Sequence, residues 1–245
     1  MIRAVFFDVD FTLIYPGPTF QGDGYRWFCA KHGVEVDAAR FGDAVNGASF
    51  LLDEAQEALY DPEIFIHYSR HIIELMGGSG SGLDACAREI YREWAACQHF
   101  SLYDDVPDVL RALAARDVRI GLISNTHRCL TSFQTHFELE GLITAAISSS
   151  EHGYMKPHPS IFEKGLQLLN VEPAEAVMVG DSLRQDIDGA RRVGMQAVLV
   201  KRSGEVGQPA DERGTGTPEI DGVPVIRTLA ELPALLWGAS EVTVR

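Results

Sequence analysis

The sequence of 245 residues carries a formal net charge of −14, is 46% hydrophobic and contains four cysteines. This acidity argues against binding to nucleic acid or to an anionic membrane surface, because both are polyanions. The cysteines show no CxxC spacing, which favours reduced thiols over a disulfide framework or a zinc cluster. No stretch approaches the length of a membrane span, so we expect a cytoplasmic protein with one domain, or with a core and an insertion.

A short strand and the turn after it form the first informative stretch. Residues 4–7 are apolar and run directly into Asp8, which predicts a strand buried on both faces. Asp10 and Thr12 follow at alternate positions, so two carboxylates and a hydroxyl stand where the strand ends. Open α/β sheets bind ligands at the carboxyl ends of their strands. Two acids this close repel each other unless a cation or a shared proton intervenes, although a plain Asp-rich turn would read the same way.

Between residue 15 and about residue 102 the chain carries helical signals and no strand signal. Apolar spacing and capping residues predict helices over 21–32, 37–48, 51–59, 62–76 and 83–98. Asp61-Pro62-Glu63 is a favourable start for the fourth, with an N-cap, a proline at the first position and an acid in the first turn. This block is therefore predicted to be an all-helical domain inserted after the first strand.

Strands and helices alternate from about residue 104 to the end. Strands are predicted over 118–123, 145–148, 176–179, 197–200 and 223–226, the last as an edge strand; helices are predicted over 106–115, 130–137, 159–169, 187–193 and 229–236. Residues 203–222, rich in Gly, Pro and acids, are predicted to form a long mobile loop. Such alternation indicates an α/β fold with a Rossmann-like, doubly wound parallel sheet. The predicted core comprises residues 1–14 and 103–245, and the inserted domain comprises residues 15–102.

Polar residues follow two further predicted strands of the core. Ser124 and Asn125 end the second strand, where their hydroxyl, amide and backbone N–H groups can donate to a phosphate oxygen. The same pair also suits a helix N-cap, which is the alternative interpretation. Lys156 lies in a stretch stiffened by two prolines. An ammonium group there can pair with a carboxylate and a phosphoryl group, or it can simply be solvated.

A second pair of acids follows the strand predicted over 176–179. Asp181 comes directly after that strand, and Asp186 enters the first turn of the next helix. An anion at a helix N-terminus is favourable in any case, by roughly 0.3–1 kcal/mol. Because Mg²⁺ prefers carboxylate, carbonyl and water oxygens, Asp8 and Asp181 from adjacent strands can supply two of its ligands.

In this order the four segments resemble the motifs of the haloacid dehalogenase-like hydrolase superfamily. The first motif, DxDx[TV], resembles Asp8-Val9-Asp10-Phe11-Thr12, and the other three resemble Ser124-Asn125, Lys156 and Gly180-Asp181 through Asp186 (GDxxxxD). The inserted helices sit where the family has its type-1 cap, and the Ser-Asn and Lys-Pro pairs are similar to subfamily IA. One departure is Phe11, where the family usually has glycine. Either this turn has a negative φ, or it tolerates strain.

The resemblance implies Mg²⁺-dependent hydrolysis of small phosphate monoesters through an aspartyl-phosphate. It implies Asp8 as nucleophile, Asp10 as general acid and base, and Lys156 as the cation that offsets charge on Asp8 and the phosphoryl oxygens. It further implies phosphate ligands at Thr12, Ser124, Asn125 and Lys156, and metal ligands at Asp8, Asp10, Asp181 and Asp186. The expected partner is a small phosphorylated metabolite, and the protein is expected to be a monomer or a homodimer.

Three other functions remain open at this stage. A 2-haloacid dehalogenase on the same fold would lack the second acid of the first motif, so Asp10 argues against it. A phosphomutase would turn over without releasing free phosphate. An inactive phosphate-binding regulatory module is disfavoured by the intact set of Asp8, Asp10, Lys156 and Asp181. The sequence does not define the physiological substrate.

Overall fold

The computed structural model describes residues 1–53, 59–202 and 219–238. Among these residues the chain forms two units: residues 1–15, 102–202 and 219–238 belong to the first, and residues 16–53 and 59–101 belong to the second. None of the helices described combines the length and the apolar character that a bilayer crossing needs.

A seven-stranded sheet forms the centre of the first unit, in the order β5-β4-β1-β6-β7-β9-β8. Its strands are β1 (Ala4–Phe7), β4 (Arg119–Ser124), β5 (Ala145–Ser148), β6 (Ala176–Gly180), β7 (Gln196–Val200), β8 (Glu219–Ile220) and β9 (Val223–Ile226). All neighbouring pairs are parallel except β8 and β9. The prediction of an α/β fold with a mostly parallel sheet is confirmed.

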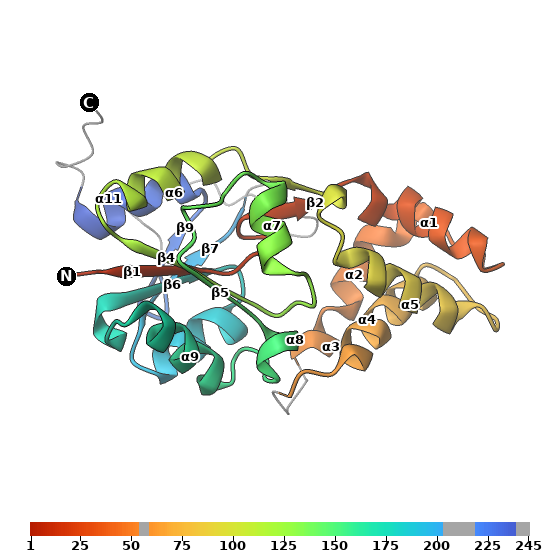
Figure 1. Ribbon diagram of the computed structural model, residues 1–245. Helices are drawn as coiled ribbons and strands as arrows, with labels where there is room; N and C mark the ends of the chain where they lie inside the picture. The colour runs from red at the N-terminus through yellow and green to blue at the C-terminus, as the bar shows by residue number, and fades with distance from the viewer. Residues whose placement is uncertain (54–58, 203–218, 239–245) are drawn as a thin grey trace. The chain divides into compact units, whose positions relative to one another are not determined.

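Helices connect these strands and cover both faces of the sheet. The helices of this unit are α6 (Val106–Ala114), α7 (Leu130–His136), α8 (Ser149–His152), α9 (Pro159–Leu169), α10 (Gly189–Arg192) and α11 (Leu232–Trp237). In Figure 1, α6 and α11 lie on one face of the sheet and α9 lies on the other. The sheet is thus covered on both sides, which explains why the strand residues are continuously apolar.

Close packing around Phe6 joins the central strand to helix α9. The Phe6 side chain is buried, and a Cβ at Gly121 on the neighbouring strand would lie 2.4 Å from its ring. A Cβ at Gly165 on α9 would lie 2.9 Å from the same ring. Real Cβ atoms are not found this close to other atoms, so both positions require glycine for the aromatic ring to fit between strand and helix.

The register of the strands brings their carboxyl ends to one edge. Phe7, the last residue of β1, is level with Leu122 of β4 on one side and Val179 of β6 on the other. The backbone N–H of Asp8 donates to the carbonyl oxygen of Val179 at 2.9 Å. Polar residues that follow β1, β4 and β6 therefore emerge at the same edge, as the sequence predicts.

The second unit is mainly helical. Its helices are α1 (Gly22–Lys31), α2 (Phe41–Ala48), α3 (Phe50–Asp53), α4 (Pro62–Leu75) and α5 (Leu83–Trp94). Helix α4 packs against α2 and α5, and α1 packs against α5. As predicted, Asp61 caps α4, because its side chain accepts a hydrogen bond from the backbone N–H of Glu63 at 2.9 Å.

Two short strands contradict the prediction that residues 15–102 contain no strand. β2 (Ile14–Pro16) and β3 (Phe100–Leu102) pair as a two-stranded sheet where the chain leaves and re-enters the first unit. Each spans only three residues, which is too short for an alternating pattern to stand out in the sequence. The edge of the large sheet is also corrected: β8, within the predicted loop 203–222, pairs outside β9, so β9 is not an edge strand.

Several predicted helices differ from the observed ones at their ends. The helix predicted over 37–48 begins with a 3₁₀ turn (Ala38–Arg40), and the helix predicted over 83–98 ends at Trp94 before another such turn (Cys97–His99). The helix predicted over 51–59 is observed only as α3, and its residues 54–58 lie outside the described part, as do residues 203–218 of the predicted loop. The last helix begins with a 3₁₀ turn (Leu229–Glu231) before α11.

Candidate active site

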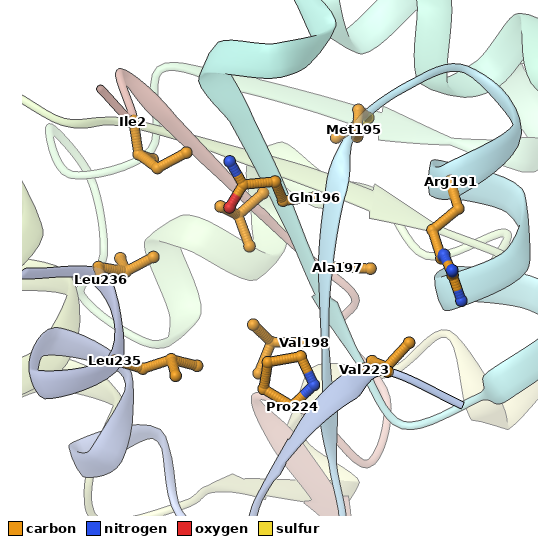
Figure 2. Close-up of a pocket in the computed structure, with 12 residues that line it drawn as sticks. Ile2, Arg191, Met195, Gln196, Ala197, Val198, Val223, Pro224, Leu235 and Leu236 are labelled. Atoms are coloured by element: carbon orange, nitrogen blue, oxygen red, sulfur yellow. The ribbon is translucent and has the colours of Figure 1, made fainter. Parts of the chain in front are cut away.

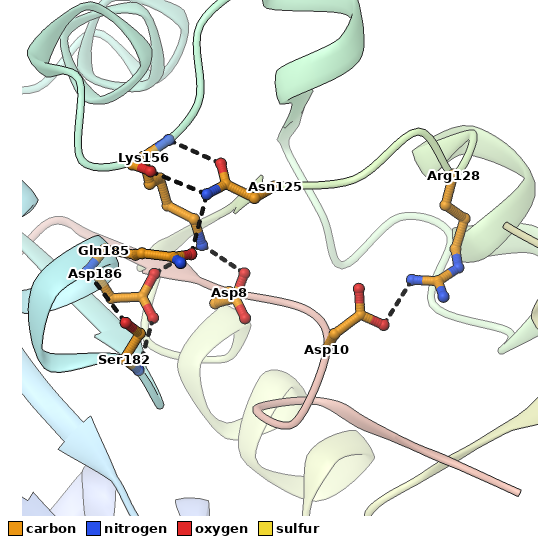
Figure 3. Close-up of polar contacts among 8 residues, drawn as sticks. All are labelled: Asp8, Asp10, Asn125, Arg128, Lys156, Ser182, Gln185 and Asp186. Carbon is orange, nitrogen blue, oxygen red and sulfur yellow. Dashed lines mark hydrogen bonds and ion pairs between the residues drawn. The ribbon is translucent and has the colours of Figure 1, made fainter. Parts of the chain in front are cut away.

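A buried lysine and two carboxylates meet at the carboxyl edge of the sheet. Lys156 lies in the loop between α8 and α9, and its Nζ donates to Asp8 Oδ1 at 2.5 Å and to Asp186 Oδ1 at 2.7 Å. Figure 3 shows the lysine reaching between the two acids. All three side chains are buried. The structure therefore brings together residues that are up to 178 positions apart, as the sequence order of Asp8 and Asp186 shows.

Burial dominates the electrostatics of this cluster. Burial raises the pKa of Asp8 to about 7; Lys156 opposes this rise, whereas Asp186 and Asp10 add to it. Burial alone would lower the pKa of Lys156, but the carboxylates of Asp186 and Asp8 outweigh burial and raise it. The lysine is therefore charged, and one ammonium faces more than one acid.

A third carboxylate completes a group of oxygens that fits a hard cation. Ligand oxygens of Asp8, Asp181 and Asp186 all lie within 4.8 Å of one another. Carboxylates are the ligands that Mg²⁺ prefers, and a divalent cation among them would offset both the burial of Asp8, the main cause of its raised pKa, and the repulsion from Asp186 and Asp10 that adds to it. The donor set and its charge thus fit Mg²⁺.

A glycine and an unusual helical turn position Asp186. A Cβ at Gly180 would lie 2.2 Å from Asp186 Oδ2, so only glycine allows the carboxylate to approach the end of β6. Residues Leu183–Asp188 form a π-helix that precedes α10, whereas the sequence predicts a helix over 187–193. Within this turn the backbone N–H of Ser182 donates to Asp186 Oδ2 at 3.1 Å. Wide helical turns of this kind occur often at functional sites.

Asn125 holds the loop that carries Lys156. Its Oδ1 accepts from the backbone N–H of Lys156 at 2.7 Å, and its Nδ2 donates to the Lys156 carbonyl oxygen at 3.0 Å. The same Nδ2 donates to Gln185 Oε1 at 3.0 Å, so the π-helix is tied into the network (Figure 3). Ser124, which precedes Asn125 and is the last residue of β4, is also buried. Gln185 is a residue that the sequence analysis missed.

Asp10 points away from the lysine and toward an arginine. Arg128 Nη1 donates to Asp10 Oδ1 at 3.0 Å, on the side of Asp10 that faces away from Lys156 in Figure 3. The arginine is buried although it is charged. Arg128 was not predicted as a site residue from the sequence. The signal that could have identified it is its position in the loop that follows β4, four residues after Ser124.

The turn after β1 adopts the strained alternative of the two that the sequence leaves open. Phe11 has a φ of 62°, in the left-handed region, which costs a residue with a side chain about 1–2 kcal/mol. Backbone hydrogen bonds stabilise the turn: Phe11 N–H donates to the Ile14 carbonyl oxygen at 2.7 Å, and Leu13 N–H donates to that of Val9 at 2.9 Å. Thr12 is buried in this turn, and among the described residues its hydroxyl has no hydrogen-bond partner. This hydroxyl can therefore donate a hydrogen bond to an oxygen atom of a ligand.

A second buried arginine, Arg202, binds the backbone of the same turn. Arg202 Nη2 donates to the carbonyl oxygen of Thr12 at 2.7 Å, and its Nη1 donates to Asp105 Oδ2 at 2.7 Å. The guanidinium carbon lies 3.9 Å from the centre of the Tyr103 ring. Asp105 Oδ2 also accepts from the backbone N–H of Leu229 at 2.6 Å. Arg202 therefore connects the turn to both α6 and the C-terminal helices.

The histidine near the lysine, His158, has a structural role. His158 is the N-cap of α9, and its Nδ1 accepts from the backbone N–H of Ser160 at 3.2 Å. Cys29, Cys86 and Cys97 are buried, and Cys129 is exposed; the Cys86 thiol donates to Cys29 Sγ at 3.5 Å.

A separate cavity of about 330 Å³ lies near the amino ends of the strands. Figure 2 shows that apolar side chains line it, together with Arg191 and Gln196. Val177, Gln196 and Val223, near the starts of β6, β7 and β9, contribute to its wall. None of the predicted site residues lines this cavity, so the acidic cluster at the carboxyl edge is the candidate active site.

Comparison with known proteins defines the class. Residues 2–194 match the family model of haloacid dehalogenase-like hydrolases. The N-acylneuraminate-9-phosphatase of Mus musculus is 31% identical over 96% of this chain and 94% of its own length. The glyceraldehyde 3-phosphate phosphatase of Methanopyrus kandleri is 31% identical over 82% of this chain and 85% of its own. The chain therefore belongs to the haloacid dehalogenase-like hydrolase family, among that family's phosphatases.

Solved structures agree with this assignment. A phosphatase of the same family from Thermococcus onnurineus is 26% identical, with 97% of this chain and 99% of that chain covered and a TM-score of 0.62. A putative hydrolase of the family from Bacillus subtilis, solved with magnesium bound, reaches a TM-score of 0.68 at 18% identity over 96% and 98% of the two chains, which shows a shared fold.

Replacing Arg202 by Met tests whether the second arginine stabilises the turn that carries Asp10 and Thr12. The substitution leaves Asp105, whose side chain is 16% exposed, without its cation, and it frees the Thr12 carbonyl oxygen. Breaking a buried ion pair on one side costs about 3–5 kcal/mol. We expect the free energy of unfolding, measured by urea titration, to fall by an amount in this range. Lys201→Met is the control, because it removes the same charge at the adjacent position, and an equal loss in both variants would contradict the account.

Proposed function

We propose that this phosphatase hydrolyses small phosphate monoesters in a Mg²⁺-dependent reaction, through a phosphoryl group carried on Asp8. The observation that supports this most strongly is the meeting of Asp8, Lys156, Asp181 and Asp186 at one edge of the sheet. A carboxylate nucleophile, a fixed cation and a set of hard oxygen ligands are the groups that phosphoryl transfer to an aspartate requires.

The first half of the reaction uses Asp8 and Asp10. A carboxylate oxygen of Asp8 attacks phosphorus, and the bond from phosphorus to the leaving oxygen breaks. Asp10 gives its proton to that oxygen, so that an alcohol leaves. In the second half, Asp10 takes a proton from the water that attacks phosphorus, which releases inorganic phosphate and regenerates Asp8.

Other side chains hold the groups that react. Lys156, which contacts Asp8 and is fixed by Asn125, offsets the charge of the nucleophile and the phosphoryl oxygens. The buried hydroxyl of Thr12 has a proton to donate to the phosphoryl group, and Ser124 lies at the adjacent strand end. The side-chain amide of Asn125 is bonded to the backbone of Lys156. We therefore assign the part of Asn125 in phosphate binding to its backbone N–H.

Asp8, Asp181 and Asp186 would hold Mg²⁺, with the Asp10 carbonyl oxygen as a further ligand. When bound, the ion would neutralise charge on the phosphoryl oxygens and orient them. Because Asp186 also accepts from Lys156 and Ser182, its distance from Asp8 is fixed by protein contacts. The carboxylates that would hold the ion are thus kept in place by contacts within the protein.

The relatives suggest the class of substrate. We propose a small phosphorylated metabolite, and the relatives' names make N-acylneuraminate 9-phosphate and glyceraldehyde 3-phosphate the first two candidates to assay. The helical unit of residues 16–101 is proposed to act as a cap that selects the leaving group. Dehalogenation is not favoured, because Asp10 would have no part in it.

Replacing Asp8 by Asn tests the nucleophile. An amide cannot form the phosphoryl intermediate, so we expect kcat for p-nitrophenyl phosphate to fall by roughly 10⁴-fold or more, as when other covalent nucleophiles are removed. The measurement is steady-state release of nitrophenol in saturating Mg²⁺. Asp188→Asn is the matched control, since Asp188 is an exposed acid close to Asp186 in sequence. Activity within tenfold of wild type in Asp8→Asn would refute the assignment.

Removing the metal tests the proposed ligand set. We expect activity to be lost in excess EDTA and restored by Mg²⁺, because the acids otherwise repel a phosphate dianion. Replacing Asp181 by Asn removes one negative ligand without removing volume. The Mg²⁺ concentration for half-maximal activity should then rise about 10–100-fold, the range typical of changes around a metal site. Full activity in EDTA, or an unchanged Mg²⁺ requirement in Asp181→Asn, would contradict the proposal.

A further inference from the structure

Arg128 is a buried cation in contact with the proposed general acid. Its side chain is 1% exposed, whereas the side chain of Asp10 is 16% exposed. Nη1 of the arginine donates to Oδ1 of Asp10 at 3.0 Å. A guanidinium group stays charged in proteins, so burying it requires an anion close by. Asp10 is the acid in contact with the guanidinium, and it comes from a segment 118 residues earlier in the chain.

The loop after β4 delivers the arginine in a fixed position. The backbone N–H of Arg128 donates to the hydroxyl of Thr126 at 3.0 Å, and Thr126 is itself buried. The carbonyl oxygen of Thr126 accepts from the backbone N–H of Ser150 at 3.3 Å, which ties this loop to helix α8. Arg128 is therefore held in place by contacts of the loop after β4, the same strand end that carries Ser124 and Asn125.

We propose that Arg128 is a positioning residue for Asp10: it binds Oδ1 and thereby leaves Oδ2 to exchange the proton with the leaving oxygen. This inference rests on the acid and base role of Asp10 in the proposed function. Oδ1 can accept from the guanidinium whether or not the carboxyl group is protonated. As the bond between phosphorus and the leaving oxygen breaks, that oxygen keeps the electron pair and takes the proton from Oδ2. The attacking water later returns a proton to Oδ2.

This role predicts a dependence on the leaving group. A nitrophenolate leaves with little need for a proton, whereas an alkoxide needs one as it departs. Losing the positioning of Asp10 should therefore slow alkyl phosphates far more than aryl phosphates. If the ion pair only connected two loops, both substrates would be slowed equally. If Arg128 held Asp10 in an unproductive direction, its removal would speed the alkyl substrate.

The test compares kcat for two substrates in wild type and Arg128→Met, in saturating Mg²⁺. The aryl substrate is p-nitrophenyl phosphate, and the alkyl substrate is glyceraldehyde 3-phosphate or, if it turns over faster, N-acylneuraminate 9-phosphate. General acid catalysis contributes about 10²–10⁴-fold, so we expect kcat for the alkyl substrate to fall at least about tenfold more than for the aryl one. Arg128→Lys keeps a cation and should recover part of this difference. An equal fall for both substrates, or a rise for the alkyl one, would overturn the proposal.

Two further variants separate this inference from the proposed function. Asp10→Asn should lower the alkyl-to-aryl ratio of kcat, and adding Arg128→Met to it should lower the ratio no further, because the arginine acts through Asp10. If Asp10→Asn leaves the ratio unchanged, the acid role of Asp10 fails and this inference fails with it. If Asp10→Asn lowers the ratio and Arg128→Met leaves it unchanged, only the positioning role of Arg128 fails. Should Arg128→Met not fold, Thr126→Val decides in its place, since it loosens Arg128 and should lower the ratio in the same direction.

Discussion

One ammonium group between two buried carboxylates is the interaction on which the site depends. Lys156 contacts Asp8 and Asp186, which are far apart in the sequence and meet where the neighbouring strands β1 and β6 end. Removing a partner from such a buried cluster typically costs about 3–5 kcal/mol, because a charge is left uncompensated. The protein therefore keeps its acids close together by surrounding them with cations that are themselves fixed by the backbone.

The ends of β4 and β7 hold these cations in place. Asn125, at the end of β4, binds both backbone groups of Lys156, and Thr126 binds the backbone of Arg128. Arg202, after β7, binds the carbonyl oxygen of Thr12. The ends of β4 and β7 thus secure the single turn that carries Asp8 and Asp10, which explains how that turn tolerates a left-handed Phe11. The chemistry we propose is a consequence of this arrangement, since the acids that repel one another are those that would bind a divalent cation.

The sequence predicted the parallel sheet and the clustered acids because Asp8 and Asp181 directly follow apolar strands, and Asp10 and Asp186 come a few residues after them. It could not predict Arg128 and Arg202, because a lone arginine is typical of a surface and their partners lie far away in the chain. Gln185 was also not predicted, because its contact with Asn125 depends on a π-helix, which has no sequence pattern of its own. β2 and β3 were too short to recognise, and β8 lies in a segment whose composition is typical of a loop. Sequence reasoning thus missed the side-chain partners between distant segments and the shortest or least regular elements.

The central claim is that Asp8 carries the phosphoryl group during turnover. The most direct measurement is acid quenching of the enzyme during steady-state turnover of p-nitrophenyl phosphate in Mg²⁺, followed by peptide mass spectrometry. The account predicts one phosphoryl group on the peptide that contains Asp8, absent when substrate is omitted. A phosphoryl group on a different residue, or rapid turnover with no phosphorylated peptide at any quench time, would contradict it.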